Sequence, residues 1–342
     1  MDRLRLPLYT VCHFLVDWAC ILLVTGPLRQ DMTTREDWLW LILDYNACAF
    51  AMQLPLGVLA DRLSRSWRTA AAGAVLVAAG WLLHSVPPAA CVTAGLGNAL
   101  FHLGGGREVL LLSEARAGPS GIFVASGAFG VWLGVCCAQS GSAGPLLPVL
   151  GMLLAGALMA RLGRREEAAA RPWSPAPLTA PLLLAAALLT LTVVLRSWVG
   201  TQMAFPWKTG LWGLAVVLCV VAGKALGGLL GDRFGWVKTG LVTLVLAAVF
   251  FLPSFRWTAA GLAAALLFNT TMAITLAALA RQFGPDHCGA AFGLTTFALF
   301  LGLIPNLLSL PDRGASPTGL CLSALASAVL LTGGLLLERR PP

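Results

Sequence analysis

Two ionisable residues stand four positions apart in the first long apolar segment of the chain. His13 and Asp17 lie within the run from residue 8 to residue 28. In a helix this spacing brings both side chains to one face, within reach of each other. A carboxylate in an apolar membrane segment is costly and usually functional, so Asp17 is a candidate proton carrier. The alternative is a structural His13–Asp17 hydrogen bond that locks the helix.

Three basic residues, Arg107, Arg196 and Lys224, also fall inside apolar segments and favour an anionic or zwitterionic substrate. Arg196 cannot lose its proton, so it needs either a substrate anion or a protein carboxylate, for which Asp44 is the candidate. An arginine that exchanges a protein carboxylate for a substrate anion would couple substrate binding to a conformational change. Lys224 either lines a central cavity or extends its ammonium group toward the membrane surface.

Other polar residues in the apolar segments have two interpretations each. His102 either faces the cavity or packs between helices through a hydrogen bond. Arg107 and Glu108 are expected to act as a gating or structural pair. The amide side chains are either cavity groups or interhelical hydrogen bonds; they are Asn46, Gln53, Asn98, Gln139, Gln202, Asn269 and Asn306.

The composition indicates that lipid, and not water, surrounds most of the chain. Of 342 residues, 58% are hydrophobic and 11% are charged, and the mean hydropathy is +0.82. A soluble domain has about 25% charged residues, so a soluble enzyme is excluded. The apolar runs are continuous and not alternating, which argues against a β-barrel. The nine cysteines form no C-x-x-C pair, so we expect neither a metal site nor a disulfide framework. No cofactor is expected either.

Apolar segments separated by charged or Pro/Gly breaks predict an all-α integral membrane protein with twelve transmembrane helices. They run over residues 8–28, 38–60, 69–86, 89–112, 119–139, 144–162, 179–204, 209–231, 237–253, 257–280, 288–309 and 316–337.

The distribution of Lys and Arg predicts the orientation of these helices. With the N-terminus in the cytoplasm, fifteen of the 23 Lys and Arg residues fall on the cytoplasmic side. Only Arg29, Arg35, Lys208, Arg256 and Arg313 fall outside. Positive residues concentrate in cytoplasmic loops, so both termini are expected in the cytoplasm, with the protein in the plasma (inner) membrane of a bacterium. The net charge of +8 therefore indicates orientation and not a nucleic-acid partner.

An internal repeat divides the chain into two halves. The string GVLADR holds Gly57 and Asp61, and the string GLLGDR holds Gly228 and Asp232, at an offset of 171 residues in a chain of 342. The predicted domains are six-helix bundles over residues 1–162 and 179–342, with a cytoplasmic linker over residues 163–178. Two parallel, pseudo-symmetric halves are a known transporter architecture.

These strings resemble the major facilitator superfamily, whose loop after the second helix reads approximately G-x-x-x-D-R-x-G-R-R. In the first copy Gly57, Asp61, Arg62 and Arg65 match, and Ser64 replaces a glycine. The resemblance implies alternating access by a monomer, with a gate latch at the cytoplasmic helix ends whose loss impairs turnover more than binding. The second copy keeps the matching residues Gly228, Asp232 and Arg233.

The strings HFLVD, GLGNALFH, LRSWVG and GKALGGLLGDRFG are similar to the fosmidomycin-resistance branch of that superfamily. The resemblance implies a drug:proton antiporter that exports its substrate and confers drug resistance. At the end of the string GLGNALFH this branch usually has F-H-P, whereas this chain has Leu103 after His102.

The sequence thus predicts a secondary active transporter for a small organic solute, anionic or amphipathic, that is not an enzyme. No phosphate-binding loop is present, because Gly223-Lys224 is followed by Ala225, so an ion gradient is the expected energy source. The alternatives are a non-transporting sensor or assembly protein on a transporter scaffold, and a uniporter or importer of a small organic anion. An intramembrane enzyme using His13, Asp17 and His102 lacks a recognisable nucleophile or metal pattern.

Overall fold

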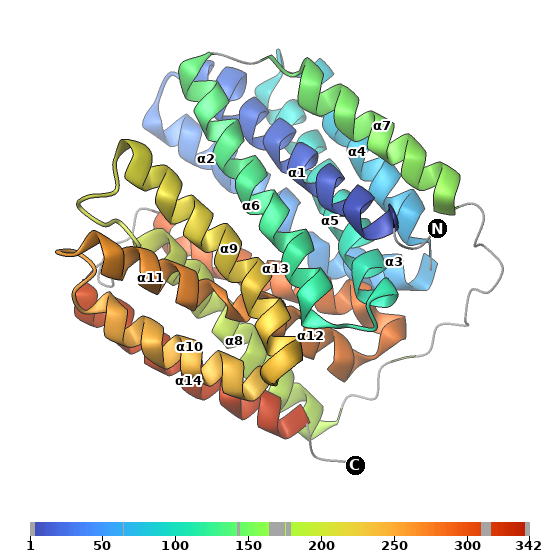
Figure 1. Ribbon diagram of the computed structural model, residues 1–342. Coiled ribbons are helices and arrows are strands. Elements are labelled where there is room, and N and C mark those ends of the chain that lie inside the picture. The colour runs from blue at the N-terminus through green and yellow to red at the C-terminus, as the bar shows by residue number, and fades with distance from the viewer. Residues whose placement is uncertain are drawn as a thin grey trace. The chain divides into compact units, whose positions relative to one another are not determined.

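The computed structural model describes residues 4–63, 65–141, 144–163, 175, 179–308 and 316–338. Every regular element within these ranges is a helix (Figure 1), which confirms the all-α prediction. The predicted cytoplasmic linker, residues 163–178, lies outside the described residues except for positions 163 and 175.

Each predicted apolar segment corresponds to one helix or to consecutive helices joined without a loop. In chain order these are α1 (Arg5–Leu23), η2 (Val24–Leu28), α2 (Arg35–Asn46), η3 (Ala47–Ala51), α3 (Gln53–Leu63), α4 (Ser66–Leu82), α5 (Pro87–Leu112), α6 (Ala117–Ser140), α7 (Leu146–Gly163), α8 (Ala180–Gln202), α9 (Gly210–Phe234), α10 (Trp236–Phe251), α11 (Thr258–Asn269), α12 (Thr271–Phe283), η5 (Pro285–His287), α13 (Cys288–Leu307) and α14 (Pro317–Glu338).

The lengths and composition of these helices point to an integral membrane protein. Within the described ranges, nine helical stretches are long and apolar enough to cross a membrane, and α10 is apolar but shorter. The other two predicted segments correspond to α4, with 17 residues, and to α5, whose 26 residues include several buried polar ones. Twelve crossings therefore stay a prediction.

Contacts between the helices define two compact units. The first unit contains Met1–Leu112, Ser126–Ser174 and Pro285–Phe297, and the second contains Ser113–Ala125, Pro175–Gly284 and Ala298–Pro342. The helices α6 and α13 are each divided between the two units. The predicted bundles over 1–162 and 179–342 stay a prediction, and they differ from these units in the first parts of α6 and α13.

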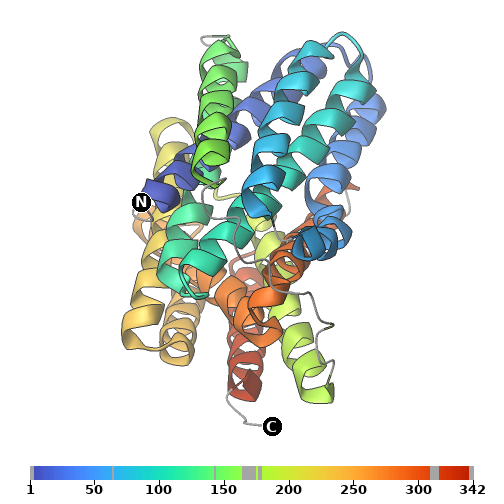
Figure 2. The ribbon, with the colours of Figure 1, turned by 90° about the vertical axis from the view of Figure 1, so that its right-hand side faces the viewer.

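Close helix packing in the first unit depends on glycine. The helices α4 and α5 run side by side (Figure 2). A Cβ atom added at Gly73 would lie 2.3 Å from the backbone nitrogen of Phe101, and one added at Gly104 would lie 2.3 Å from that of Ala70. Small residues permit this approach between membrane helices. In the second unit, α14 packs along α10 and α8.

Candidate functional site

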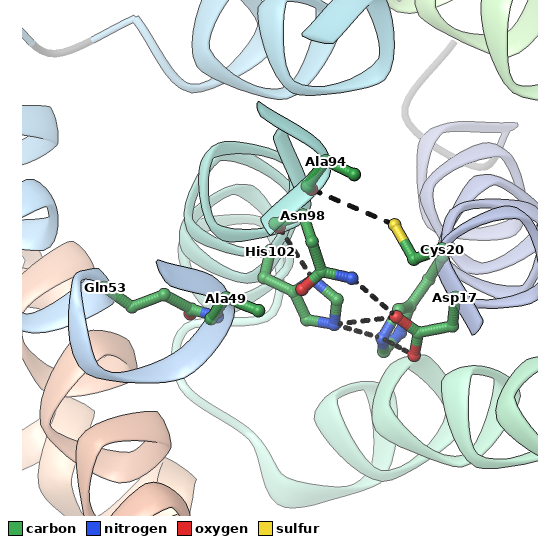
Figure 3. Close-up of polar contacts among 8 residues, drawn as sticks. Asp17, Cys20, Ala49, Gln53, Ala94, Asn98 and His102 are labelled. Atoms are coloured by element: carbon green, nitrogen blue, oxygen red, sulfur yellow. Dashed lines mark hydrogen bonds and ion pairs between the residues drawn. The ribbon is translucent and has the colours of Figure 1, made fainter. Parts of the chain in front are cut away.

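His13 and Asp17 of α1 and His102 of α5 form one polar cluster in the first unit; Figure 3 labels Asp17 and His102. The Nε2 atom of His13 lies 3.3 Å from Oδ2 of Asp17 and 2.8 Å from Nε2 of His102. The Nε2 atom of His102 lies 3.6 Å from Oδ1 of Asp17. The structure thus brings together the predicted His13–Asp17 pair and a third candidate residue that stands 85 positions after Asp17.

Asn98 holds two members of this cluster in place. Its Nδ2 group donates a 3.0 Å hydrogen bond to Oδ1 of Asp17, and its backbone carbonyl lies 2.9 Å from Nδ1 of His102. A carbonyl oxygen only accepts, so Nδ1 of His102 carries a proton. Asn98 and His102 are four residues apart on α5 and both point toward Asp17 (Figure 3), a spacing that the sequence already displays.

The short distance between the two imidazole rings defines the protonation of the cluster. Two Nε2 atoms at 2.8 Å require one donor and one acceptor, so at least one ring has an unprotonated Nε2. A neutral His102 with its proton on Nδ1 presents that lone pair to His13. The two imidazoles are therefore joined by one hydrogen bond, and the Asp17 carboxylate lies 3.3 Å and 3.6 Å from their Nε2 atoms.

The cluster is almost closed to solvent. The side chains of His13 and Asp17 are 5% and 12% exposed, and that of His102 is 9% exposed. On one side lies Gly127 of α6, where an added Cβ would stand 2.3 Å from Nε2 of His13 and 2.4 Å from Oδ2 of Asp17. Any larger residue at position 127 would collide with both groups.

Asp61, near the end of α3, occupies a second polar centre in the first unit. Its Oδ1 accepts hydrogen bonds from the backbone N–H of Gly289 at 2.8 Å and from Nε of Arg107 at 2.9 Å, and its Oδ2 accepts one from Ala290 at 2.7 Å. Gly289 and Ala290 belong to the first turn of α13, whose N–H groups lack partners within the helix. A carboxylate is favourable at a helix N-terminus, so Asp61 caps α13.

Asp232, the repeat partner of Asp61, makes the equivalent contact in the second unit. The backbone N–H groups of Ala117 and Gly118 donate to its two carboxylate oxygens at 3.0 Å and 2.8 Å. These residues form the first turn of α6. The indole Nε1 of Trp236 also donates to Asp232, at 3.1 Å. The sequence repeat is therefore also a repeat of contacts: each Asp caps the N-terminus of a helix far away in the chain.

The glycines of the two strings explain how the aspartates reach these helices. A Cβ added at Gly57 would lie 2.3 Å from the carbonyl oxygen of Gly289, and one added at Gly228 would lie 2.2 Å from that of Ala117. Each glycine stands one helical turn before its aspartate and permits backbone contact. Arg107 of α5 is a basic partner of Asp61 that the repeated strings do not contain.

Arg107 and Glu108 each have a partner on another helix. Arg107 binds Asp61 and also donates to Oγ of Ser66 at 2.6 Å. Glu108 forms a buried ion pair with Arg5 of α1. Because Arg107 is bound by Asp61, it no longer supports an anionic substrate, and its role in a gate stays a prediction.

Arg196 of α8 is the buried cation of the second unit. The residue is 5% exposed, and its Nη1 group donates a 3.1 Å hydrogen bond to Oγ1 of Thr275 on α12. Its Nη2 group has no hydrogen-bond partner among the described residues. Within the described ranges no carboxylate lies at ion-pair distance from it, and the predicted pairing with Asp44 stays a prediction.

The remaining predicted residues lie on the expected helices. Asp44 is exposed on α2, and Lys224 is half-buried on α9. Arg62 is exposed on α3, Arg65 is exposed at the start of α4, and Arg233 is exposed on α9, where it stacks on Phe234. The residues that the sequence analysis missed are mainly the backbone partners of Asp61 and Asp232, which carry no side-chain pattern.

Comparisons with known proteins identify the fold. No family model matches the sequence, and no curated protein matches it. The structure is similar to the Escherichia coli fucose:proton symporter FucP, with a TM-score of 0.69, 14% identity, and coverage of 98% of this chain and 99% of that chain. It is also similar to a bacterial homologue of the iron transporter ferroportin, with a TM-score of 0.63, 13% identity, and coverage of 97% and 98%. The first is a proton symporter, and the second is a homologue of an iron transporter. The chain therefore has the fold of the major facilitator superfamily of membrane transporters.

Proposed function

We propose that the protein is a secondary active transporter that moves a small organic anion by alternating access, coupled to protons and in the direction of export. The fold supports transport of a small molecule across a membrane. The substrate class, the coupling ion and the direction go beyond the fold and rest on particular residues. Export and drug resistance rest on the resemblance to the fosmidomycin-resistance branch alone.

The observation that carries the substrate class is the state of Arg196. A buried guanidinium with one neutral partner and one unsatisfied Nη2 group is strongly destabilising. Charged residues at membrane depth are rare and mark substrate or ion pathways. A bound carboxylate, phosphate or phosphonate would satisfy Nη2 and compensate the charge. The twelve Trp and fifteen Phe residues also permit an amphipathic anion.

We place the coupling proton in the His13–Asp17–His102 cluster. It contains a carboxylate and two imidazoles within hydrogen-bond reach, so a proton can pass between them without leaving the cluster. Removing the Asp17 carboxylate should therefore uncouple transport from the proton gradient while leaving anion binding on Arg196 in place.

The aspartates at the helix N-termini are proposed as gates. Asp61 holds α3 on the first turn of α13, and Asp232 holds α9 on the first turn of α6. Breaking and remaking such contacts during the transport cycle would give the latch implied by the superfamily resemblance. Their loss is expected to affect turnover more than substrate affinity.

Anion binding is tested by ligand-induced thermal stabilisation of the purified protein in detergent. The panel contains monocarboxylates, dicarboxylates, phosphonates and, for contrast, amphipathic cations. A ligand that binds only the folded protein raises the thermal midpoint, by an amount that grows with the ratio of its concentration to its Kd. We expect stabilisation by an anion in the wild type and its loss in Arg196→Met. Stabilisation by cations alone, or by anions equally in both proteins, would overturn the proposed substrate class.

The second candidate is a non-transporting sensor or assembly protein on the same scaffold. Such a protein would bind its ligand as described but would show no flux across a membrane. A uniporter or importer would show flux without proton coupling or in the opposite direction. Reconstitution into vesicles separates these alternatives.

A further inference from the structure

We propose that His13, Asp17 and His102 form a binding site for one divalent first-row transition-metal ion, such as Co²⁺, Zn²⁺ or Fe²⁺. The inference rests on the arrangement of these three side chains and does not depend on the proposed transport function. Nothing in the sequence indicated it, because the ligands lie on two helices and His102 stands 85 positions after Asp17.

The donor atoms are of the kind that such ions prefer. Imidazole nitrogens suit Zn²⁺, Fe²⁺, Co²⁺ and Ni²⁺, and two histidines with one carboxylate form a common facial ligand set. Metal–nitrogen and metal–oxygen bonds of about 2.0–2.2 Å place two ligand atoms about 2.9–3.4 Å apart, for angles between octahedral and tetrahedral. The three distances between the ligand atoms are 2.8, 3.3 and 3.6 Å. Small side-chain movements would therefore bring all three atoms to bonding distance from one ion.

The groups around the ligands are those of a prepared metal site. A metal-binding histidine almost always donates its other ring N–H to a carbonyl or carboxylate, which orients the ring and fixes its tautomer. His102 does so through Nδ1 to the carbonyl of Asn98, which leaves Nε2 as the ligand atom. The side chain of the same residue orients Asp17. One residue therefore positions two of the three ligands.

Charge also favours a divalent cation at this position. As metal ligands, two imidazoles that coordinate through an unprotonated Nε2 and one carboxylate contribute a single negative charge, in a site that is nearly closed to solvent. The ion would replace the hydrogen bond between the two Nε2 atoms, with the proton of His13 moving to Nδ1, so a shared proton and the metal are alternative occupants. Three protein ligands leave at least one coordination position for water or for an anion.

Co²⁺ binding to the full chain provides the test, since this ion reports its ligands through visible d–d absorption. The protein is purified in detergent, its affinity tag is removed, and Co²⁺ is titrated; Zn²⁺ is then added as a competitor. We expect one Co²⁺ per chain with nitrogen-containing coordination, displaced by Zn²⁺. This readout requires no transport, so failure of the metal proposal and failure of the proposed function are distinguishable.

Variants locate the ion. His13→Ala, Asp17→Asn and His102→Ala are each expected to weaken Co²⁺ binding at least tenfold. Asn98→Ala removes the side-chain hydrogen bond to Asp17 and keeps the backbone carbonyl that accepts from His102. Loss of such an outer partner typically costs about 10- to 100-fold in metal affinity. The matched control is His84→Ala, which removes an exposed histidine at the end of α4 and should leave the affinity unchanged.

Folding of each variant is checked by its elution as a single species and by its thermal midpoint without metal. If His13→Ala does not fold, Asp17→Asn and Asn98→Ala provide the test. Asp17→Asn keeps the side-chain volume, and Asn98→Ala introduces a residue that favours the helix. Absence of Co²⁺ and Zn²⁺ binding in the wild type would overturn the proposal. Binding that survives in the cluster variants, or is lost in His84→Ala, would also overturn it.

Discussion

Asp61 accepts a 2.8 Å hydrogen bond from the backbone N–H of Gly289, 228 residues further along the chain. The contact is possible because Gly57, one turn before Asp61, has no side chain: its added Cβ would stand 2.3 Å from the carbonyl oxygen of Gly289. The second unit repeats the arrangement with Gly228, Asp232 and the first turn of α6. In both halves of the sequence, a glycine and the aspartate one turn after it thus bind the N-terminus of a distant helix.

Alanine at either of these glycines should separate the helices. Gly57→Ala and Gly228→Ala each insert a methyl group against a backbone carbonyl, and overpacking of this kind costs about 1–3 kcal/mol. Both variants should show a lower thermal midpoint in detergent. Gly213→Ala is the matched control on α9, because an added Cβ at Gly213 meets nothing within 4 Å. Equal midpoints for Gly228→Ala and Gly213→Ala would contradict the close contact.

Removing Arg107 should destabilise the first unit through Asp61. The two side chains are 7% and 1% exposed, and breaking a buried ion pair by deleting one partner costs about 3–5 kcal/mol. Since two backbone N–H groups still support Asp61, we expect a loss near the lower end for Arg107→Met. Chemical unfolding in detergent, followed by tryptophan fluorescence, measures it.

The control for Arg107→Met is Arg256→Met, which removes an exposed arginine from the loop between α10 and α11. Such surface substitutions usually change stability by less than about 0.5 kcal/mol. If the two variants unfold alike, the Asp61–Arg107 pair does not stabilise the fold.

Arg196→Met, unlike Arg107→Met, should not lower the stability of the protein. The substitution replaces an uncompensated buried cation by an apolar side chain of similar length, and such replacements are often neutral or stabilising. We therefore expect an unchanged or higher thermal midpoint without ligand, combined with loss of anion binding. A lower midpoint would show that Arg196 supports the fold, and it would remove the main argument for an anionic substrate.

The orientation that the positive residues predict is tested separately. Reporter domains that are active only in the cytoplasm should be active when they are fused to either terminus. Cysteine labelling from outside should reach a residue placed near Arg256, in the loop after α10, and not one placed near Arg65, in the loop after α3. Labelling of the second site in intact cells would reverse the predicted topology.

Local patterns made the helices predictable. The apolar segments correspond to the helices of the structure, and the i, i+4 spacing of His13 and Asp17 correctly placed the two side chains within contact distance. The repeated glycine–aspartate strings also identified residues that make equivalent contacts. All of these features depend on neighbours within a few turns of one helix, and such features can be recognised in a single sequence.

The partners across the fold were not predictable in the same way. Asp61 binds Arg107 from another helix and the backbone of α13, and a backbone N–H has no sequence pattern. For the same reason Arg107 was counted among the basic residues that favour an anionic substrate, although the structure shows that Asp61 already compensates its charge. Joining Asn98 and His102 to Asp17 required the packing of α5 on α1, which four-residue spacing alone does not specify.

The most direct test of the transport account is proton movement in vesicles that contain the purified protein. A pH gradient is imposed, a pH-sensitive dye reports the interior, and the anions that stabilise the detergent-solubilised protein are added one at a time. The account predicts an anion-dependent proton flux in the wild type that is abolished in both Asp17→Asn and Arg196→Met, with both variants folded. Absence of flux with every binding anion, or flux that persists in Asp17→Asn, would contradict it.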